Sequence, residues 1–266
     1  MSTKYFISSD IHSFFDVWMA ALQQAGFSKY NTEHKIIVCG DLFDRGNQSR
    51  ECFEFVSDMI QQDRLIYIRG NHEDLLFDAC RQCGRTHIGS HHVSNGTIKT
   101  IGNLMNKTEY DILCSVYTSE EWNDFVEPVL RFIDNNAKDY YEVDDFIFVH
   151  GWVPTTADEE GHECVHENWR EGDWKEARWS NGMEQAHFKL TVPDKTVVCG
   201  HWHTSWGHSR YHKDGSEWDL KDANFYPYID KGIIALDACT AYTSMINVAV
   251  LNKEEGKWTI HTPQAK

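Results

Sequence analysis

Residues 35–46 read K-I-I-V-C-G-D-L-F-D-R-G. The run Ile36–Cys39 is apolar, rich in β-branched side chains and unbroken by polar ones, which is typical of a strand buried on both faces. Gly40 ends the run, and two aspartates and an arginine follow it directly. In open α/β sheets, ligands bind at the carboxyl ends of the strands. This stretch therefore predicts a functional site at one edge of a sheet.

Four other short apolar runs have the same form, each followed within three residues by glycine, aspartate, asparagine or histidine. They are Tyr5–Ile7, Leu65–Ile68, Phe146–Val149 and Thr196–Cys199. Amphipathic helices are predicted over about 16–25, from the candidate cap Ser49 onward, and after Asn71. Alternation of strands and helices predicts an α/β fold with a partly parallel sheet. The polar clusters after all five runs are then expected at the same edge.

Residues 80–145 are expected to form a helical insertion beside the sheet. Thr118-x-x-Glu121 has the form of a capping box at a helix start, and Pro128 is expected to kink that helix. A hairpin turning at Asp144–Asp145 returns the chain to the core. These features predict a largely helical segment between the first three strands and the remaining ones.

The segment of about 155–180 is acidic and rich in tryptophan, and is expected to form a surface lobe. Its tryptophans, Trp169, Trp174 and Trp179, are expected to pack in the core or the lobe rather than stack on a nucleobase. Further strands are predicted over 233–236, 246–251 and 258–261. Because no internal repeat or flexible linker is visible, residues 1–266 are assigned to a single domain.

The composition narrows the class of partner. The chain has 266 residues and a net charge of −16, with no basic cluster. Proteins that bind duplex nucleic acid or anionic membranes need positive faces, so neither partner is expected. No run of about 18 apolar residues predicts a membrane span, and the first eight residues do not resemble a signal peptide. Eight cysteines without an export signal are expected to be reduced thiols in a cytoplasmic protein.

Seven residues of metal-ligand type follow the predicted strands. A single aspartate or histidine after a strand usually caps a turn, but seven at five strand ends that share one edge predict a metal centre. Their mixed nitrogen and oxygen atoms suit Mn, Fe, Zn, Co or Ni better than Ca or a lone Mg. The candidates are Asp10, His12, Asp41, Asn71, His150, His201 and His203. The histidines expected to lie on the surface without such a role are His91, His92, His162, His166, His208 and His212.

The motifs around these residues resemble those of a known family. Asp10-x-His12, the G-D-x-x-D-R-G form of 40–46 and the G-N-H-E of 70–73 resemble the calcineurin-like metallophosphoesterase signature, in its phosphoprotein-phosphatase branch. That branch also contains bacterial and phage phosphatases and symmetrical diadenosine tetraphosphate hydrolases. Later segments agree with it: V-H-G at 149–151, G-H-W-H at 200–203, N-G-T-I-K-T at 95–100, and, more loosely, 237–242. The resemblance covers nearly the whole chain in the right order.

The resemblance implies a four-layer α/β/β/α sandwich and a binuclear centre of divalent transition-metal ions. Manganese is favoured, and iron, zinc, nickel or cobalt also fit. Asp10 and His12 would hold the first ion, and Asp41 would bridge. The second ion would be held by Asn71, His150 and His201. A hydroxide between the two ions would attack phosphorus in line.

It also implies roles around the substrate. His72 resembles the general acid that protonates the leaving oxygen, and Asp44 the carboxylate that orients and charges it. Arg45 would grip the phosphate oxygens with its planar fork, with Asn71 beside them. Glu73 is expected to be structural and to tie down the loop.

Three positions depart from the branch. A second histidine follows G-H-x, so His203 is expected to bind the first ion, as in the wider superfamily. Where the branch often has a phosphate-binding arginine in W-x-R, this chain has Asn181, with Arg178 just before the tryptophan. The sequence leaves open whether either contacts phosphate. The first motif is Ser-Asp-Ile-His-Ser, a change not expected to affect metal ligation.

The implied function is hydrolysis of phosphomonoesters, with phosphoserine and phosphothreonine in proteins included. The alternative is hydrolysis of dinucleoside polyphosphates or another phosphoanhydride. A nuclease is disfavoured by the charge balance, and a non-catalytic interaction module by the retention of every ligand and of the general acid. The expected partner is accordingly a small anionic phosphorylated substrate or a phosphoprotein.

Overall fold

The computed structural model describes residues 3–83, 88–254 and 257–262, and its strands form two large sheets. The first sheet has the order β13-β12-β1-β2-β3-β4 and the second the order β10-β11-β9-β6-β5. The strands of the first are β1 (Lys4–Ser8), β2 (His34–Cys39), β3 (Leu65–Ile68), β4 (Ala137–Lys138), β12 (Ala249–Glu254) and β13 (Lys257–His261). Those of the second are β5 (Tyr141–Val143), β6 (Phe146–Phe148), β9 (Thr196–Cys199), β10 (Tyr228–Asp230) and β11 (Ile233–Ala235).

The five apolar runs predicted as strands form the centres of the two sheets. β1, β2 and β3 pair in parallel, and α1 (Phe15–Gln24) and α2 (Ser49–Gln61) connect them. In the second sheet β6, β9 and β11 also run parallel. The predicted partly parallel α/β fold is therefore confirmed, and the carboxyl ends of these strands carry the polar loops.

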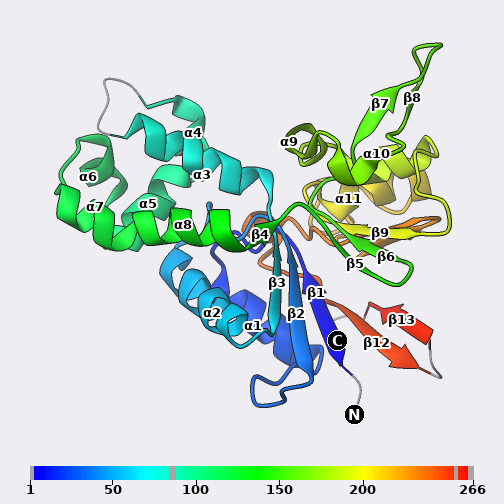
Figure 1. Ribbon diagram of the computed structural model, residues 1–266, viewed down its shortest axis with the longest axis horizontal. Coiled ribbons are helices and arrows are strands. Elements are labelled where there is room, and N and C mark those ends of the chain that lie inside the picture. Colours follow the sequence, from blue (N-terminus) through cyan, green and yellow to red (C-terminus); the bar gives the residue numbers. More distant parts are fainter. Residues whose placement is uncertain (1–2, 84–87, 255–256, 263–266) are drawn as a thin grey trace.

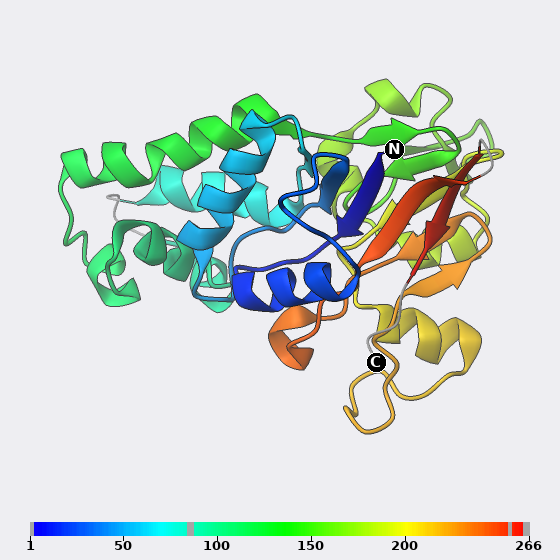
Figure 2. The same cartoon turned by 90° about the horizontal axis from the view of Figure 1, so that it is seen from below.

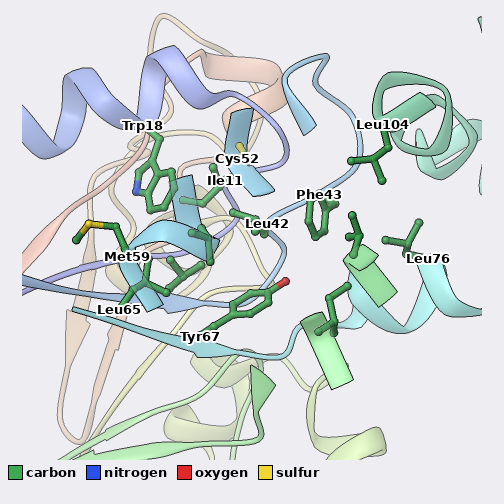
Figure 3. Close-up of a cluster of buried hydrophobic side chains, with 14 of the residues drawn as sticks. Ile11, Trp18, Leu42, Phe43, Cys52, Met59, Leu65, Tyr67, Leu76 and Leu104 are labelled. Carbon is green, nitrogen blue, oxygen red and sulfur yellow. The ribbon is translucent and has the colours of Figure 1, made fainter. Parts of the chain in front are cut away.

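Alternation of side chains along the strands builds the layers. Ile7 and Ile37 of the first sheet pack with Phe148 and Val198 of the second in one buried cluster. Their neighbours along the strands point the other way, toward α1 and α2; Figure 3 shows part of that second cluster, with Trp18 and Leu42 among its members. Figure 1 accordingly shows helices, sheet, sheet and helices in sequence, and Figure 2 shows α1 lying across its sheet. The expected α/β/β/α sandwich is confirmed.

Tryptophans fill the outer layer over the second sheet. Trp152, Trp169 and Trp174 are buried there in one cluster. The cluster also includes residues of α9 (Trp174–Ala177), α10 (Gly182–His187) and α11 (Thr204–Gly207). The hairpin of β7 (Thr155–Ala157) and β8 (Glu163–Val165) projects from this layer in Figure 1. Trp169 and Trp174 therefore pack as expected, whereas 49% of Trp179 is exposed.

Helices fill most of the predicted insertion, of which residues 84–87 lie outside the described part. They are α3 (Asn71–Gln82), α4 (Ser90–Ser94), α5 (Thr97–Met105), α6 (Glu109–Leu113), α7 (Ser119–Phe125) and α8 (Glu127–Asn136). The capping box of Thr118 and Glu121 is present. Pro128 lies in the first turn of α8 and so separates two helices instead of kinking one.

Two local predictions about the chain differ from the structure. Ser49 is the first residue of α2, and Gln48 occupies the cap position; the Ser49 hydroxyl is hydrogen-bonded to the hydroxyl of Ser13 at 2.9 Å and caps no helix amide. The strand predicted over 246–251 begins only at Ala249. The hairpin at Asp144–Asp145 forms as predicted. None of the described helices is long and apolar enough to cross a membrane.

Candidate metal centre and active site

The loops after the parallel strands are bonded to one another at a single edge. The Asp10 amide donates to the Gly40 carbonyl at 3.2 Å, and the His12 amide donates to the Asp41 carbonyl at 3.0 Å. The Asp10 carboxylate accepts from the His201 amide at 3.0 Å. Residues almost two hundred positions apart in sequence are thereby fixed as neighbours.

The backbone of this edge is held in an uncommon conformation. Left-handed φ values between 51° and 75° occur at Asp10, His12, Asp41, Asp44, Arg45 and His201. Such conformations cost about 1–3 kcal/mol each in non-glycine residues and cluster at functional sites, where the surrounding structure enforces them. The loops are therefore shaped to present particular side chains rather than to minimise local strain.

Three imidazoles share one arrangement. His12 and His150 each direct Nδ1 to a backbone carbonyl at 2.9 Å, of Phe43 and Cys39 respectively. His201 directs Nε2 to the Trp179 carbonyl at 3.1 Å. A carbonyl can only accept a hydrogen bond, so the nitrogen that faces it carries a proton and the other ring nitrogen is the one available to a metal ion, as metal-ligating histidines usually require.

Asp41 lies at the centre of these rings. Its carboxylate is 3.9 Å from His12 Nε2 and 3.3 Å from His150 Nε2. Ligand atoms of Asp41, His150 and His201 all lie within 4.8 Å of one another, as do those of Asp41, His12 and His72. The amide oxygen of Asn71 is 2.7 Å from His150 Nε2, and Asp10 is 4.0 Å from His12 Nε2. Two neighbouring clusters thus share one carboxylate.

Burial and the neighbouring charges shift the pKa values of the groups in these clusters. Burial alone would raise the pKa of the Asp41 carboxyl, but His150 and His72 hold it well below its usual range. Burial would likewise lower the pKa of His150, yet Asp41 raises it to about 10. Burial lowers the pKa of His201 to about 3, with His150 adding to the effect. A divalent ion would take the place of the proton that the carboxylates attract to His150.

The donor set therefore fits transition-metal ions. It combines inward-facing imidazole nitrogens with buried carboxylate and amide oxygens, the mixture that manganese, iron, zinc, nickel or cobalt accepts. Burial together with Arg45 lowers the pKa of His12, so this ring is neutral and able to ligate. Of the seven predicted ligands, the structure brings six together: Asp10, His12, Asp41, Asn71, His150 and His201.

His203 is placed elsewhere. Its Nδ1 lies 2.9 Å from the hydroxyl of Ser205, and its Nε2 lies 3.6 Å from a carboxylate oxygen of Glu217. The ring also packs against Trp218 at 4.3 Å between centroids. Both nitrogens thus have partners outside the clusters around Asp41. The geometry gives no support to His203 as a ligand of the first ion.

His72 and Asp44 form a buried pair beside the first cluster. His72 Nδ1 is 2.7 Å from Asp44 Oδ2. Burial would lower the pKa of His72, but Asp41 and the hydrogen bond to Asp44 raise it. The other ring nitrogen is 3.4 Å from an Arg45 guanidinium nitrogen. An imidazole oriented by a carboxylate and adjoining a cationic group is the arrangement expected of a proton donor that acts on a bound anion.

Two threonines that sequence reasoning left without a role hold the Asp44 carboxylate. Thr97 donates to Asp44 Oδ2 at 2.8 Å, and Thr100 donates to Oδ1 at 2.9 Å. Both lie in the first turn of α5, three residues apart, and both are fully buried. Gly96, with φ +84°, precedes them, and a Cβ there would collide with the backbone of Arg45. The N-G-T-I-K-T segment was the available signal, since its spacing puts both hydroxyls on one helix face.

Glu73 acts as expected of a structural residue. Its carboxylate accepts from the amides of Asp41 at 3.1 Å, Leu42 at 2.9 Å and Gly70 at 2.6 Å. It therefore joins the loop after β2 to the loop after β3. This bond set fixes the backbone on which Asp41 and Asn71 are mounted.

The three candidates for phosphate binding differ in their location and in their side-chain partners. Arg45 is exposed at the edge of the cluster. Arg178 is instead paired with Asp74 at 3.0 Å and Asp139 at 2.8 Å. Asn181 caps α10 by accepting from two backbone amides. Arg178 and Asn181 thus have structural partners, and Arg45 is the arginine that faces the centre.

Two histidines expected on the surface are buried. His92 is fully buried, and 7% of His208 is exposed. Asp237, which had no assigned role, is also buried, and burial raises its pKa to about 6. Its charge in turn adds to the effect of burial in raising the pKa of Asp10. These placements depend on helices and loops far away in sequence.

Residues 3–228 match the calcineurin-like phosphoesterase family. The asymmetrical bis(5'-nucleosyl)-tetraphosphatase PrpE of Anoxybacillus flavithermus is 34% identical over 79 residues, which are 27% of this chain and 32% of that protein. The chain thus spans about a third of the length of the curated relatives it matches.

Solved structures show the same fold at low identity. A protein serine/threonine phosphatase from Saccharomyces cerevisiae superposes with a TM-score of 0.53 at 14% identity, covering 100% of this chain and 81% of that one. A cold-active protein-tyrosine phosphatase of a psychrophilic Shewanella species gives 0.50 at 15% identity, covering 99% and 81%. The family match over residues 3–228 includes the central strands β1, β2, β3, β6 and β9, the metal-ligand candidates and the His72–Asp44 pair. The chain therefore belongs to the calcineurin-like phosphoesterase family.

Proposed function

We propose that this protein is a metal-dependent phosphatase that hydrolyses phosphomonoesters, including phosphoserine and phosphothreonine. The observation that carries the proposal is the shared arrangement of His12, His150 and His201. Each ring has one nitrogen facing a backbone carbonyl, and each ring offers a ligand atom within 4.8 Å of the Asp41 carboxylate. Such preorganisation of buried imidazoles around a carboxylate has a clear use in metal ligation.

The proposed centre holds two divalent ions, with manganese favoured. Asp10 and His12 would hold one, Asn71, His150 and His201 the other, and Asp41 would contact both. When bound, the ions supply a water acidified toward hydroxide and neutralise the charge of the phosphoryl group. The protein contributes a rigid cradle at the strand ends, in which all of these ligands except the partly exposed His201 are buried.

The surrounding residues are assigned to substrate binding and proton transfer. Arg45 faces the centre and would hold two terminal phosphate oxygens, with the Asn71 amide beside them. His72 would deliver a proton to the leaving oxygen from Nε2, while Asp44 holds its Nδ1 at 2.7 Å. The buried carboxylate keeps the ring oriented and stabilises its protonated form.

A comparison of substrates tests this assignment. With manganese, para-nitrophenyl phosphate is expected to be cleaved faster than its bis-ester, because Arg45 needs terminal phosphate oxygens for bidentate contact. Replacing Arg45 by Lys, which keeps the charge but removes the fork, should lower kcat/KM for the monoester more than for the diester. A bis-ester cleaved much faster than the monoester would contradict the proposal.

Dinucleoside polyphosphates are the second candidate substrate, and one observation favours them. Trp179 and Trp202 adjoin His201 and are 49% and 37% exposed. Exposed indoles beside a phosphate-cleaving centre offer faces on which a nucleobase can stack. The curated relatives are named as nucleosyl tetraphosphatases. Faster cleavage of diadenosine tetraphosphate than of a phosphoserine peptide would favour this candidate over a protein substrate.

Thr100 offers a test of how Asp44 acts. Thr100→Val keeps the shape but removes a hydrogen bond to a buried carboxylate, worth about 1.5–3 kcal/mol. Turnover of an alkyl phosphate, which has a poor leaving group, should fall about 10-fold or more, with metal content unchanged. Thr100→Ser should restore most of it. A Ser variant as impaired as the Val variant, or equal losses for alkyl and para-nitrophenyl phosphates, would contradict this role.

We place the protein in the cytoplasm. All eight cysteines are free, and Cys39, Cys52 and Cys199 are buried. Unpaired thiols are usual in a reducing compartment.

A further inference from the structure

A third group of ligand-type side chains lies on the helical insertion. His91 and His92 of α4 both direct Nε2 to Asp78 Oδ2 on α3, at 3.9 Å and 3.1 Å. One ligand atom from each of the three residues lies within 4.8 Å of the other two. The group shares no residue with the clusters around Asp41, and Asp78 follows His72 on α3 by six positions, or about 9 Å of helix.

The geometry of α4 does not by itself bring the rings of His91 and His92 together. Successive residues on a helix point about 100° apart and do not face each other. Yet the ring centroids of His91 and His92 are 3.9 Å apart, and both rings face one carboxylate oxygen. Two protonated rings so close would repel, so attraction of two imidazolium ions to Asp78 does not explain the arrangement.

The spacing matches that of the catalytic clusters. The Asp41 carboxylate lies 3.3–3.9 Å from its imidazole neighbours, and Asp78 lies 3.1–3.9 Å from His91 and His92. Ligands at about 2.0–2.2 Å from a tetrahedral ion are necessarily separated by distances of this order.

A supporting contact orients the carboxylate. The Gln82 side-chain amide donates to Asp78 Oδ2 at 2.9 Å, and its carbonyl oxygen accepts from the Gly89 amide at 2.8 Å. Gln82 therefore holds the Asp78 carboxylate on α3 and at the same time connects α3 to Gly89, the residue before α4. Figure 1 shows α4 lying alongside α3. Partners of this kind around metal ligands fix the ligand geometry.

We propose that Asp78, His91 and His92 form a separate site for one divalent transition-metal ion, of which zinc fits best. Two imidazoles and one carboxylate are a common protein ligand set for zinc, with water in the remaining position. The ion would join α3 to α4, just before Thr97 and Thr100, the threonines that hold Asp44. Its role is therefore to fix the insertion against the segment that carries His72.

Equilibrium dialysis of the chelator-treated chain against micromolar free zinc, with ion counting by mass spectrometry, tests the site. His92 is buried, so the informative variants are His91→Ala and Asp78→Asn, whose side chains are about half exposed. His162→Ala is the matched control, because His162 is 3.6 Å from both Asp158 and Glu160 on the surface. Wild type and control should bind about one ion per chain more than the two variants.

Equal ion counts in all four proteins would overturn the proposal. The outcome is separate from that of the catalytic centre. If all four proteins bind fewer ions than the two expected at the catalytic centre, that result counts against the ligands around Asp41. A loss of ions confined to His91→Ala and Asp78→Asn can come only from the third group. Circular dichroism of the metal-free variants checks that both remain folded.

Discussion

His72→Asn is expected to lower turnover of an alkyl phosphate by about 10²–10⁴-fold while metal content and folding stay nearly intact. Asparagine keeps the size and a polar atom toward Asp44 but supplies no proton. The structure makes this a sharp test, because His72 Nε2 is 3.9 Å from Asp41, the same distance as the proposed ligand His12. What distinguishes His72 is its partner, since its other nitrogen faces a carboxylate and not a backbone carbonyl.

The leaving group supplies the internal control for this variant. Para-nitrophenolate leaves without much protonation, so its release should suffer less than that of an alkoxide. Asp44→Asn should give a weaker version of the same pattern, because Asp44 acts through His72. If His72→Asn instead loses an ion, then His72 is a ligand and the general-acid assignment is wrong. An unchanged turnover for both substrates would remove His72 from the mechanism altogether.

Asp41→Asn is expected to remove both ions and to lower turnover more than about 10³-fold for every substrate. The Asp41 carboxylate is the one group shared by the two clusters. Without ions the site loses the acidified water and several kcal/mol of charge neutralisation, and each 1.4 kcal/mol is about tenfold in rate. Metal content after reloading and turnover of para-nitrophenyl phosphate measure the two effects together.

Asp145→Asn is a suitable control for that variant, since Asp145 is exposed at the β5–β6 turn. It should keep its ions and its rate. A normal metal content in Asp41→Asn would show that the centre is assembled without the bridging carboxylate. Loss for alkyl phosphates alone would mean that Asp41 serves proton transfer instead.

Much of the scaffold was predictable because its signals are local. Unbroken β-branched runs such as Ile36–Cys39 have no polar face to present to water, so they become strands covered on both sides. The glycine and aspartate that end each run place polar groups at the sheet edge. The Thr118–Glu121 capping box likewise forms from residues three apart. In each case the determining contacts lie within a few residues of the chain.

Local sequence patterns could not predict which side chains pair with partners from distant parts of the chain. G-H-x-H does not reveal that His203 turns to Ser205 and Glu217, and R-W-S-N does not reveal that Arg178 pairs with Asp74. The burial of His92 and the grip of Thr100 on Asp44 likewise depend on where α4 and α5 pack.

The sequence by itself determined which segments are buried strands and which ligand-type residues follow the ends of those strands. Only the tertiary structure decided which of those side chains meet. The physical reason is that secondary structure follows from bonds and periodicity among near neighbours. The rotamer and hydrogen-bond partner of a buried polar group are chosen by residues distant in sequence, because each buried donor and acceptor must be satisfied by whatever the fold brings beside it.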